Sequence, residues 1–173
     1  DAFYNSATVP WSKFLTGEQG LPPADSSYDP MSYMIKAAHD RRMEFHAWLN
    51  PYRATWDLDT ASLSLIHPMR ALPPNLKNQW FFRYGRRYYF NPANPFVRQH
   101  LVNVVRDIIV RYDVDGIHFD DYFYPYKEQG ENLNDYNEFA ANPRGFTNIE
   151  DWRRDNVNKL VQDVSTMIKK FKP

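Results

Sequence analysis

The chain contains two short segments in which apolar and polar side chains alternate with the period of a β-strand, at residues 43–50 and 114–120. Successive side chains of a strand point to opposite faces, so each segment has one apolar and one polar face. The apolar faces hold Phe45, Ala47 and Leu49, and then Ile117 and Phe119. The polar faces hold Glu44, His46, Trp48 and Asn50, and then Gly116, His118 and Asp120. We expect the apolar faces to pack against helices and the polar faces to point inward.

Three further segments show the spacing of apolar positions that is typical of an amphipathic helix. The first spans residues 30–42 and follows Asp29, a good N-cap residue in front of a proline. The second spans residues 94–112 and leads directly into the second strand. The third follows Thr147 and Glu150, which fit a capping box, and it ends in lysines that complement the helix dipole.

Four segments lack a clear strand or helix pattern. Residues 1–27, 54–78 and 126–143 are rich in proline or polar side chains and are predicted to be loops. Loops of this length are often functional. Residues 80–90 place aromatic side chains on both sides of Gly85, which indicates a β-hairpin.

The predicted order is helix, strand, helix, strand, helix, with long loops after the strands. This order is typical of an α/β fold with parallel strands, in which chemistry lies at the carboxyl ends of the strands. A (β/α)8 barrel usually needs about 250 residues, whereas the chain has 173. We therefore expect residues 1–173 to be one partial domain, the central portion of a TIM barrel, from a longer protein.

The composition excludes several classes of site and partner. The chain has 21 acidic and 21 basic residues, so it lacks the basic surplus that favours nucleic-acid or membrane-surface binding. It has no cysteine, and no apolar run is long enough to span a bilayer. Aromatic residues make up 17% of the chain, and many lie in predicted loops. Exposed aromatic rings suit sugar binding, but they can equally fill a core or support a long loop.

Several motifs resemble those of one family. They are VDGIHFDDYFYP at residues 114–125, EFHAWLNPYR at residues 44–53, and DAFY with PWS near the start of the chain. This pattern resembles the glycosyl hydrolase-like family 10 domain over nearly the whole chain. The resemblance implies a TIM barrel of which the chain holds the third and fourth strands, a glycan substrate such as bacterial cell-wall glycan, and a location in the bacterial envelope or outside the cytoplasm.

Glycoside hydrolysis usually needs two carboxyl groups, and the chain offers adjacent ones at the end of the second strand. We expect Asp120 to face an open cleft and to act as nucleophile or base. Its setting in Gly-Ile-His-Phe-Asp is also similar, more loosely, to the fourth strand of α-amylase-like enzymes. Asp121 is the second candidate, as reactive acid, sugar ligand or loop anchor. The alternative is a structural pair that caps the following loop.

The remaining candidate residues are expected to bind substrate. His118 lies on the same face as Asp120 and could donate a hydrogen bond that keeps this carboxylate ionised, or it could be a core histidine. The other candidates are His46, Trp48, Asn50, Tyr52, Arg53, Tyr122 and Tyr124. For each there is a structural alternative: Trp48 could fill the barrel, Arg53 could pair with a loop acid, and the tyrosines could support the loop.

Two other functions fit part of the pattern. His46, His118, Asp120 and Asp121 have the side chains of a metal-dependent hydrolase, although no His-x-His or His-Glu-x-x-His spacing is present. A glycan-binding barrel without catalysis is the third possibility. We expect no metal and no cofactor.

A partial barrel has consequences for activity and assembly. If the general acid lies on a later strand, residues 1–173 alone should hydrolyse no glycoside. Unpaired strand edges favour pairing with a second copy, so self-association is expected.

Overall fold

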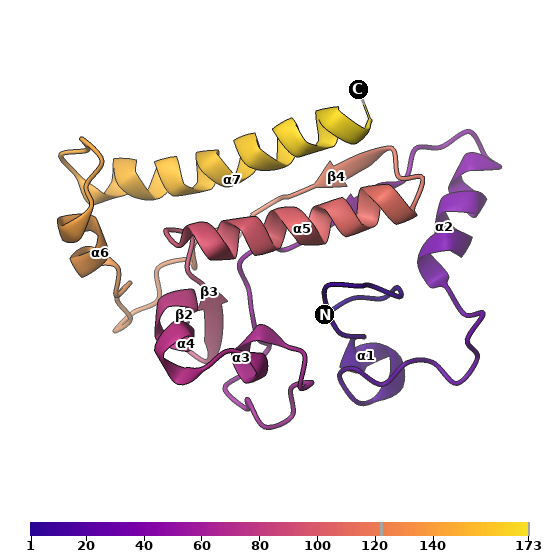
Figure 1. Ribbon diagram of the computed structural model, residues 1–173, viewed down its shortest axis with the longest axis horizontal. Helices are drawn as coiled ribbons and strands as arrows, with labels where there is room; N and C mark the ends of the chain where they lie inside the picture. Colours follow the sequence, from indigo (N-terminus) through magenta and orange to yellow (C-terminus); the bar gives the residue numbers. More distant parts are fainter. Residues whose placement is uncertain (122, 173) are drawn as a thin grey trace.

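The computed structural model describes residues 1–121 and 123–172 (Figure 1). In chain order the elements are α1 (Lys13–Thr16), α2 (Pro30–His39), β1 (His46–Trp48), α3 (Pro68–Ala71), α4 (Pro74–Trp80), β2 (Phe81–Tyr84), β3 (Arg87–Phe90), α5 (Pro95–Arg111), β4 (Gly116–His118), α6 (Tyr136–Ala141) and α7 (Ile149–Phe171). None of these described helices is both long and apolar enough to cross a membrane.

The two predicted strands pair in parallel, as expected for an α/β fold. In β1 and β4, His46 lies opposite Gly116 and Trp48 lies opposite His118. Each strand is shorter than predicted, although Leu49 N–H donates to the His118 carbonyl over 3.0 Å and extends the pairing. A Cβ at Gly116 would lie 2.9 Å from His46 Nδ1, so the imidazole can cover β4 only because this residue is a glycine.

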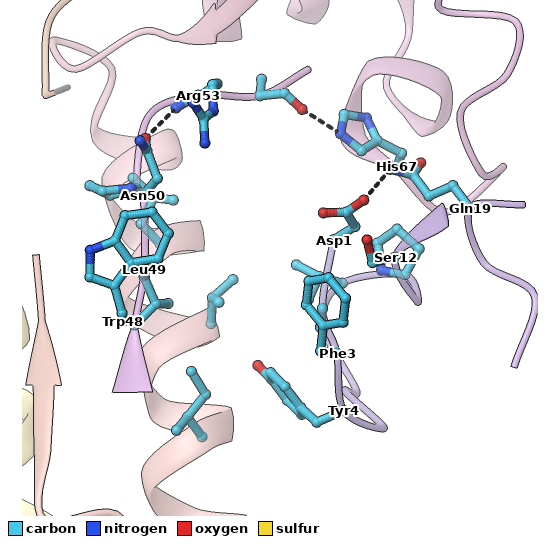
Figure 2. Close-up of a pocket in the computed structure, with 18 of the residues that line it drawn as sticks. Asp1, Phe3, Tyr4, Ser12, Gln19, Trp48, Leu49, Asn50, Arg53 and His67 are labelled. Carbon is cyan, nitrogen blue, oxygen red and sulfur yellow. Dashed lines mark hydrogen bonds between the residues drawn. The ribbon is translucent and has the colours of Figure 1, made fainter. Parts of the chain in front are cut away.

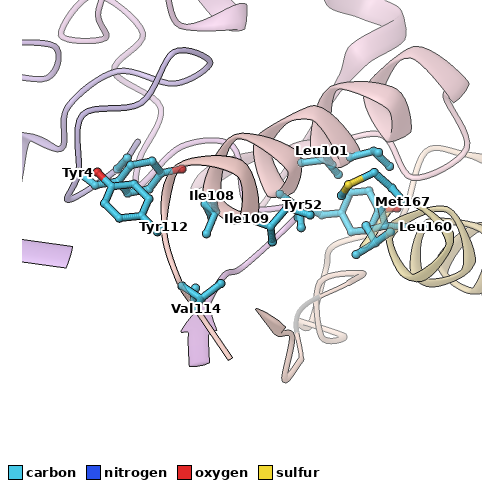
Figure 3. Packing of buried hydrophobic residues seen from close by; sticks show 14 of the residues in the cluster. Tyr4, Tyr52, Leu101, Ile108, Ile109, Tyr112, Val114, Leu160 and Met167 are labelled. Carbon is cyan, nitrogen blue, oxygen red and sulfur yellow. The ribbon is translucent and has the colours of Figure 1, made fainter. Parts of the chain in front are cut away.

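The apolar faces of the strands pack as predicted. Ala47 is buried, and the other four apolar residues of the two strands lie against the same hydrophobic core. Helices α5 and α7 pack against each other, and α5 buries Val97, Val105 and Ile108 (Figure 1). Leu160 of α7 is fully buried in this core (Figure 3). The chain passes from β1 through the β2–β3 hairpin and α5 to β4. Since α5 covers the apolar face of the two strands, their polar face stays open.

The ends of two helices differ from the prediction. The predicted capping box at Thr147 and Glu150 placed the start of α7 one residue too early. Asn148 is the N-cap, and its Oδ1 accepts from the Asp151 N–H over 2.8 Å. Helix α2 ends at His39, and Arg42 then takes a left-handed φ of 57° where the chain turns toward β1. Sequence periodicity alone does not locate such ends.

The predicted hairpin is confirmed, and the predicted loops contain short helices. Strands β2 and β3 are antiparallel and turn at Gly85, whose φ of 56° is left-handed. Helices α1, α3, α4 and α6 lie wholly or largely in segments predicted to be loops. Each makes two turns at most, which is too short for a periodic apolar stripe. Helix α3 is capped by the side chain of His67, whose Nδ1 accepts from the Met69 N–H over 3.1 Å.

Candidate active site

The polar residues of the two strands meet at one edge of the sheet. Trp48 and His118 are direct neighbours, and both side chains are exposed. Asn50 and Asp120 each lie two residues further along, at the carboxyl ends of β1 and β4. The parallel pairing therefore brings Trp48, Asn50, His118 and Asp120 to the same edge, as the sequence predicted.

Asp120 carries an exposed carboxylate at this edge. Its Oδ1 accepts a hydrogen bond of 2.5 Å from the backbone N–H of Asp121. This bond is the main reason that the pKa of Asp120 lies below its ordinary value, and the side chain of Trp48 lowers the pKa further. Asp120 is therefore ionised at neutral pH, as a nucleophile or base must be.

Asp121 is oriented differently, into its own loop. Its Oδ2 accepts a hydrogen bond of 2.8 Å from the Tyr126 hydroxyl, and the residue is half-buried. This contact is what a loop anchor would make. The two polar groups of Asp121 therefore have separate partners: its backbone N–H donates to Asp120, and its side chain accepts from Tyr126.

The two histidines have different surroundings. His118 is exposed and makes no hydrogen bond to Asp120 among the described residues, so its role in substrate binding stays a prediction. His46 lies over Gly116, and its Nε2 is 3.0 Å from Glu44 Oε2. Within residues 1–121 and 123–172, no group of three or more His, Cys, Asp or Glu side chains is arranged to hold a metal ion.

Asn50 and Arg53 form the turn that leaves β1. Asn50 Oδ1 accepts from the Arg53 N–H over 3.4 Å (Figure 2). The Arg53 guanidinium lies over the ring of Trp56, with 5.7 Å from Cζ to the ring centroid. Arg53 also forms an antiparallel bridge with Tyr89 of β3, so the hairpin fixes the path of this turn.

Of the three tyrosines predicted to bind substrate, Tyr52 is structural instead and Tyr124 makes a supporting contact. Tyr52 has 0% of its surface exposed and lies in the core beside α5 and α7, so it cannot contact a glycan (Figure 3). Tyr124 is half-buried, and its hydroxyl accepts from Asn156 Nδ2 over 3.0 Å. This bond fixes the loop after β4 to α7, which is the supporting role weighed in the sequence. Tyr122 lies outside the described residues.

The hydroxyl of Tyr52 offers a direct test of its structural role. It is buried with no hydrogen-bond partner among the described residues, and burial raises the pKa of Tyr52 well above its ordinary value. We expect Tyr52→Phe to leave the free energy of unfolding unchanged or to raise it by about 1–2 kcal/mol, because it removes an unsatisfied polar group. Urea unfolding measures this change. A loss of stability above about 1 kcal/mol would show that the hydroxyl has a partner.

The long segment that follows β4 is tied to the β2–β3 hairpin. The Tyr84 hydroxyl of the hairpin accepts from the Glu128 N–H over 2.9 Å. Asn91, which ends the same hairpin segment, donates from Nδ2 to Glu138 Oε1 over 2.8 Å. The segment after β4 is thus held in place by the hairpin, which favours a preorganised carboxyl edge.

A cavity of about 580 Å³ lies beside β1. Its wall combines the apolar face of β1, helix α5 and the N-terminal segment, and Trp48, Asn50 and Arg53 line the end nearest the carboxyl edge (Figure 2). Asp120 does not line it. We expected Asp120 to face an open cleft. In the described residues it instead lies on an exposed edge of the sheet, next to the cavity.

His67 closes the polar end of this cavity but serves the fold. It is buried, and desolvation lowers its pKa to about 4. The neutral ring accepts the Met69 N–H at Nδ1, so Nε2 carries the proton that is donated to the Ala54 carbonyl over 3.1 Å. Sequence analysis did not single out His67 or Gln19, and it noted Asp1 only as the first residue of the DAFY motif. The pairing of Gln19 Nε2 with Asp1 Oδ2 at 3.4 Å joins positions too far apart for a local pattern to connect.

The chain is similar throughout to known glycosyl hydrolase sequences. The sequence profile of the family described as Glycosyl hydrolase-like 10 matches residues 1–173. Glycosyl hydrolase YngK of Bacillus subtilis (strain 168) is 45% identical over 175 residues, which cover 100% of this chain and 33% of YngK. Glycosyl hydrolase DigH of Escherichia coli (strain K12) is 34% identical over 176 residues, which cover 99% of this chain and 39% of DigH. The chain thus spans less than two fifths of the length of these relatives.

Proposed function

The chain belongs to the glycosyl hydrolase-like 10 family, and from this premise we propose that it supplies the nucleophile or base of a glycosidase. The proposed substrate is a polysaccharide, with bacterial cell-wall glycan as the first choice. Both curated relatives described above carry the name glycosyl hydrolase, which supports the reaction class.

The observation that carries this proposal is the state of Asp120. Its carboxylate is exposed, held ionised by the Asp121 N–H, and placed at the carboxyl end of β4. Trp48 beside it offers an exposed ring for a sugar, and Asn50 at the end of β1 offers an amide for a hydroxyl. This combination suits a carboxylate that either attacks the anomeric carbon or takes a proton from the attacking water.

Two reaction courses use such a carboxylate. As a nucleophile, Asp120 forms an ester with the anomeric carbon while a second carboxylic acid protonates the leaving oxygen, and water then cleaves the ester. As a base, Asp120 takes a proton from the water that attacks the anomeric carbon directly, while a second carboxylic acid protonates the leaving oxygen. In both, one water is consumed and one new reducing end is formed.

The wider setting is proposed on the same basis. We propose that β1 and β4, with α5 as the connection between them, are consecutive strands of a TIM barrel, which their parallel register supports. The motif resemblance supports a location in the bacterial envelope or outside the cytoplasm. The unpaired outer edges of β1 and β4 within the described residues support self-association of the chain.

A pH-resolved assay of reducing-end release tests the proposal. The full-length protein is incubated with bacterial cell-wall glycan, and kcat/KM is followed from pH 3 to 8. We expect release, with an acidic limb below about pH 4, because Asp120 must be ionised and its pKa lies below the ordinary value near 3.9. Binding of the glycan without any release of reducing ends would instead establish a non-catalytic barrel.

A further inference from the structure

Five side chains near the turn after β1 form an exposed aromatic and basic group, which we call the Trp56 cluster. Its members are Lys13, Phe14, Arg53, Trp56 and Arg87. Trp56 is 55% exposed and Phe14 is 63% exposed, and their rings meet edge to face with centroids 5.7 Å apart. Large aromatic side chains exposed together indicate a binding surface more often than a packing role.

Two guanidinium groups lie over the same indole. The Cζ atoms of Arg53 and Arg87 are 5.7 and 5.2 Å from the centroid of the Trp56 ring. Stacking on an aromatic ring restricts the guanidinium and leaves its N–H edge directed outward. Such an edge matches the two oxygens of a carboxylate.

The charge of the cluster is only partly balanced. Lys13 pairs with Asp57 at 3.8 Å, and its ammonium also lies 5.7 Å from the centroid of Phe14. Arg87 has no carboxylate partner among the described residues. Arg87 therefore contributes a positive charge without an ion-pair partner here, and the acids beside the cluster are Asp57 next to Lys13 and Glu128 next to Gly85.

The Trp56 cluster lies on the same side of the fold as the candidate active site. Arg53 and Trp56 follow the carboxyl end of β1, and the bridge between Arg53 and Tyr89 brings the start of β3, with Arg87, to this place. Trp48, Asn50, Arg53 and Trp56 line one cavity. Asp120 does not line this cavity, but the Trp48 side chain hydrogen-bonds Asp120 and also lines the cavity, so an oligosaccharide bound along Trp48 can extend from Asp120 to the cluster.

We infer that the Trp56 cluster is a subsite for a sugar unit that bears a free carboxylate. Arg87, with Arg53, binds the carboxylate, and the exposed rings of Trp56 and Phe14 contact the sugar. This inference deepens the proposed function, because it names an acidic glycan as the substrate class of the same site. It rests on that function only for the position of the glycan relative to Asp120.

The test is calorimetric binding to the full-length protein carrying Asp120→Asn, so that the probe is not consumed. The probes are a tetrasaccharide of bacterial cell-wall glycan with free carboxylates and the methyl ester of the same tetrasaccharide. We expect the free acid to bind about tenfold tighter than the ester, since a charge-assisted bidentate contact is lost on esterification. The preference should weaken as salt is raised.

The variants identify the residue responsible. Arg87→Gln should remove most of the preference for the free acid, and Arg87→Lys should keep part of it, because the charge remains while the fork is lost. Arg86→Gln is the matched control, since Arg86 is exposed in the same hairpin turn and, among the described residues, Arg53 and Arg87 are the arginines placed over the Trp56 ring. It should keep the full preference.

Two results would overturn the inference. Equal affinity for the acid and the ester would show that no carboxylate is recognised, and equal losses in Arg86→Gln and Arg87→Gln would show only general attraction. Neither result touches the proposed hydrolysis, which is measured as reducing ends released by the protein with Asp120 intact. Conversely, a protein that binds the acid selectively but releases no reducing ends refutes hydrolysis and keeps the subsite.

Discussion

Replacing Asp120 with asparagine in the full-length protein is expected to reduce kcat/KM for glycan hydrolysis by about 10²- to 10⁴-fold. The amide cannot carry the negative charge that attacks the anomeric carbon or takes a proton from water. Asparagine has nearly the same shape and keeps an oxygen that can accept the Asp121 N–H, so the loop should stay in place. The loss should therefore appear in turnover, measured as reducing ends released.

Asp121→Asn is the matched control for this substitution. It alters the neighbouring carboxylate but keeps the backbone N–H that serves Asp120 and an acceptor for the Tyr126 hydroxyl. We expect it to retain activity within about tenfold of the unmodified protein. If Asp121→Asn proved inactive while Asp120→Asn remained active, the two carboxylates would exchange roles and the assignment made here would be wrong.

The placement of Asp120 could be predicted because it depends on local alternation. In β4 the sequence Gly116-Ile117-His118 alternates strictly, and parallel pairing with β1 follows from the helix between them. These two facts fix which side chains share a face and at which edge the strand ends. The same reasoning placed Trp48, Asn50 and His118 correctly.

The tyrosines could not be assigned in this way, because loops have no period. Tyr52 lies only two residues after Asn50, yet it is buried. The Phe90 N–H donates to the Tyr52 carbonyl over 2.8 Å and holds this segment against the core. Tyr124 is fixed by Asn156, which lies 32 positions further along the chain. Contacts between such distant residues depend on the completed fold.

The Trp56 cluster shows the same limit in a binding surface. Trp56 could be noted as an aromatic residue in a predicted loop, which is a signal for sugar binding but also for loop support. Its partners Phe14 and Arg87 lie in the N-terminal segment and in β3. Hydrogen bonds from Ala54 and Thr55 to the Tyr88 carbonyl bring this loop to the hairpin, and the ion pair of Lys13 with Asp57 brings it to the N-terminal segment.

Replacing Trp152 with alanine is expected to cost about 3–5 kcal/mol of the free energy of unfolding, the largest stability effect that we predict. Trp152 is 1% exposed near the start of α7. Its Nε1–H donates to the Asn142 carbonyl over 2.9 Å, and its ring meets Phe139 edge to face at 5.9 Å. The Arg144 guanidinium covers the ring at 4.9 Å. Alanine would leave a cavity where α6, α7 and the loop after β4 meet.

The comparison that isolates burial is Trp48→Ala, measured by urea unfolding beside Trp152→Ala. Both substitutions remove the same side chain, but Trp48 is 54% exposed, so its loss should change the free energy of unfolding by only about 0.5 kcal/mol. The reason for the difference is that surface removed from water, together with the cavity left behind, sets the cost of a truncation. Similar costs for the two variants would mean that Trp48 is packed against other groups, and the open polar face on which the candidate site depends would be closed.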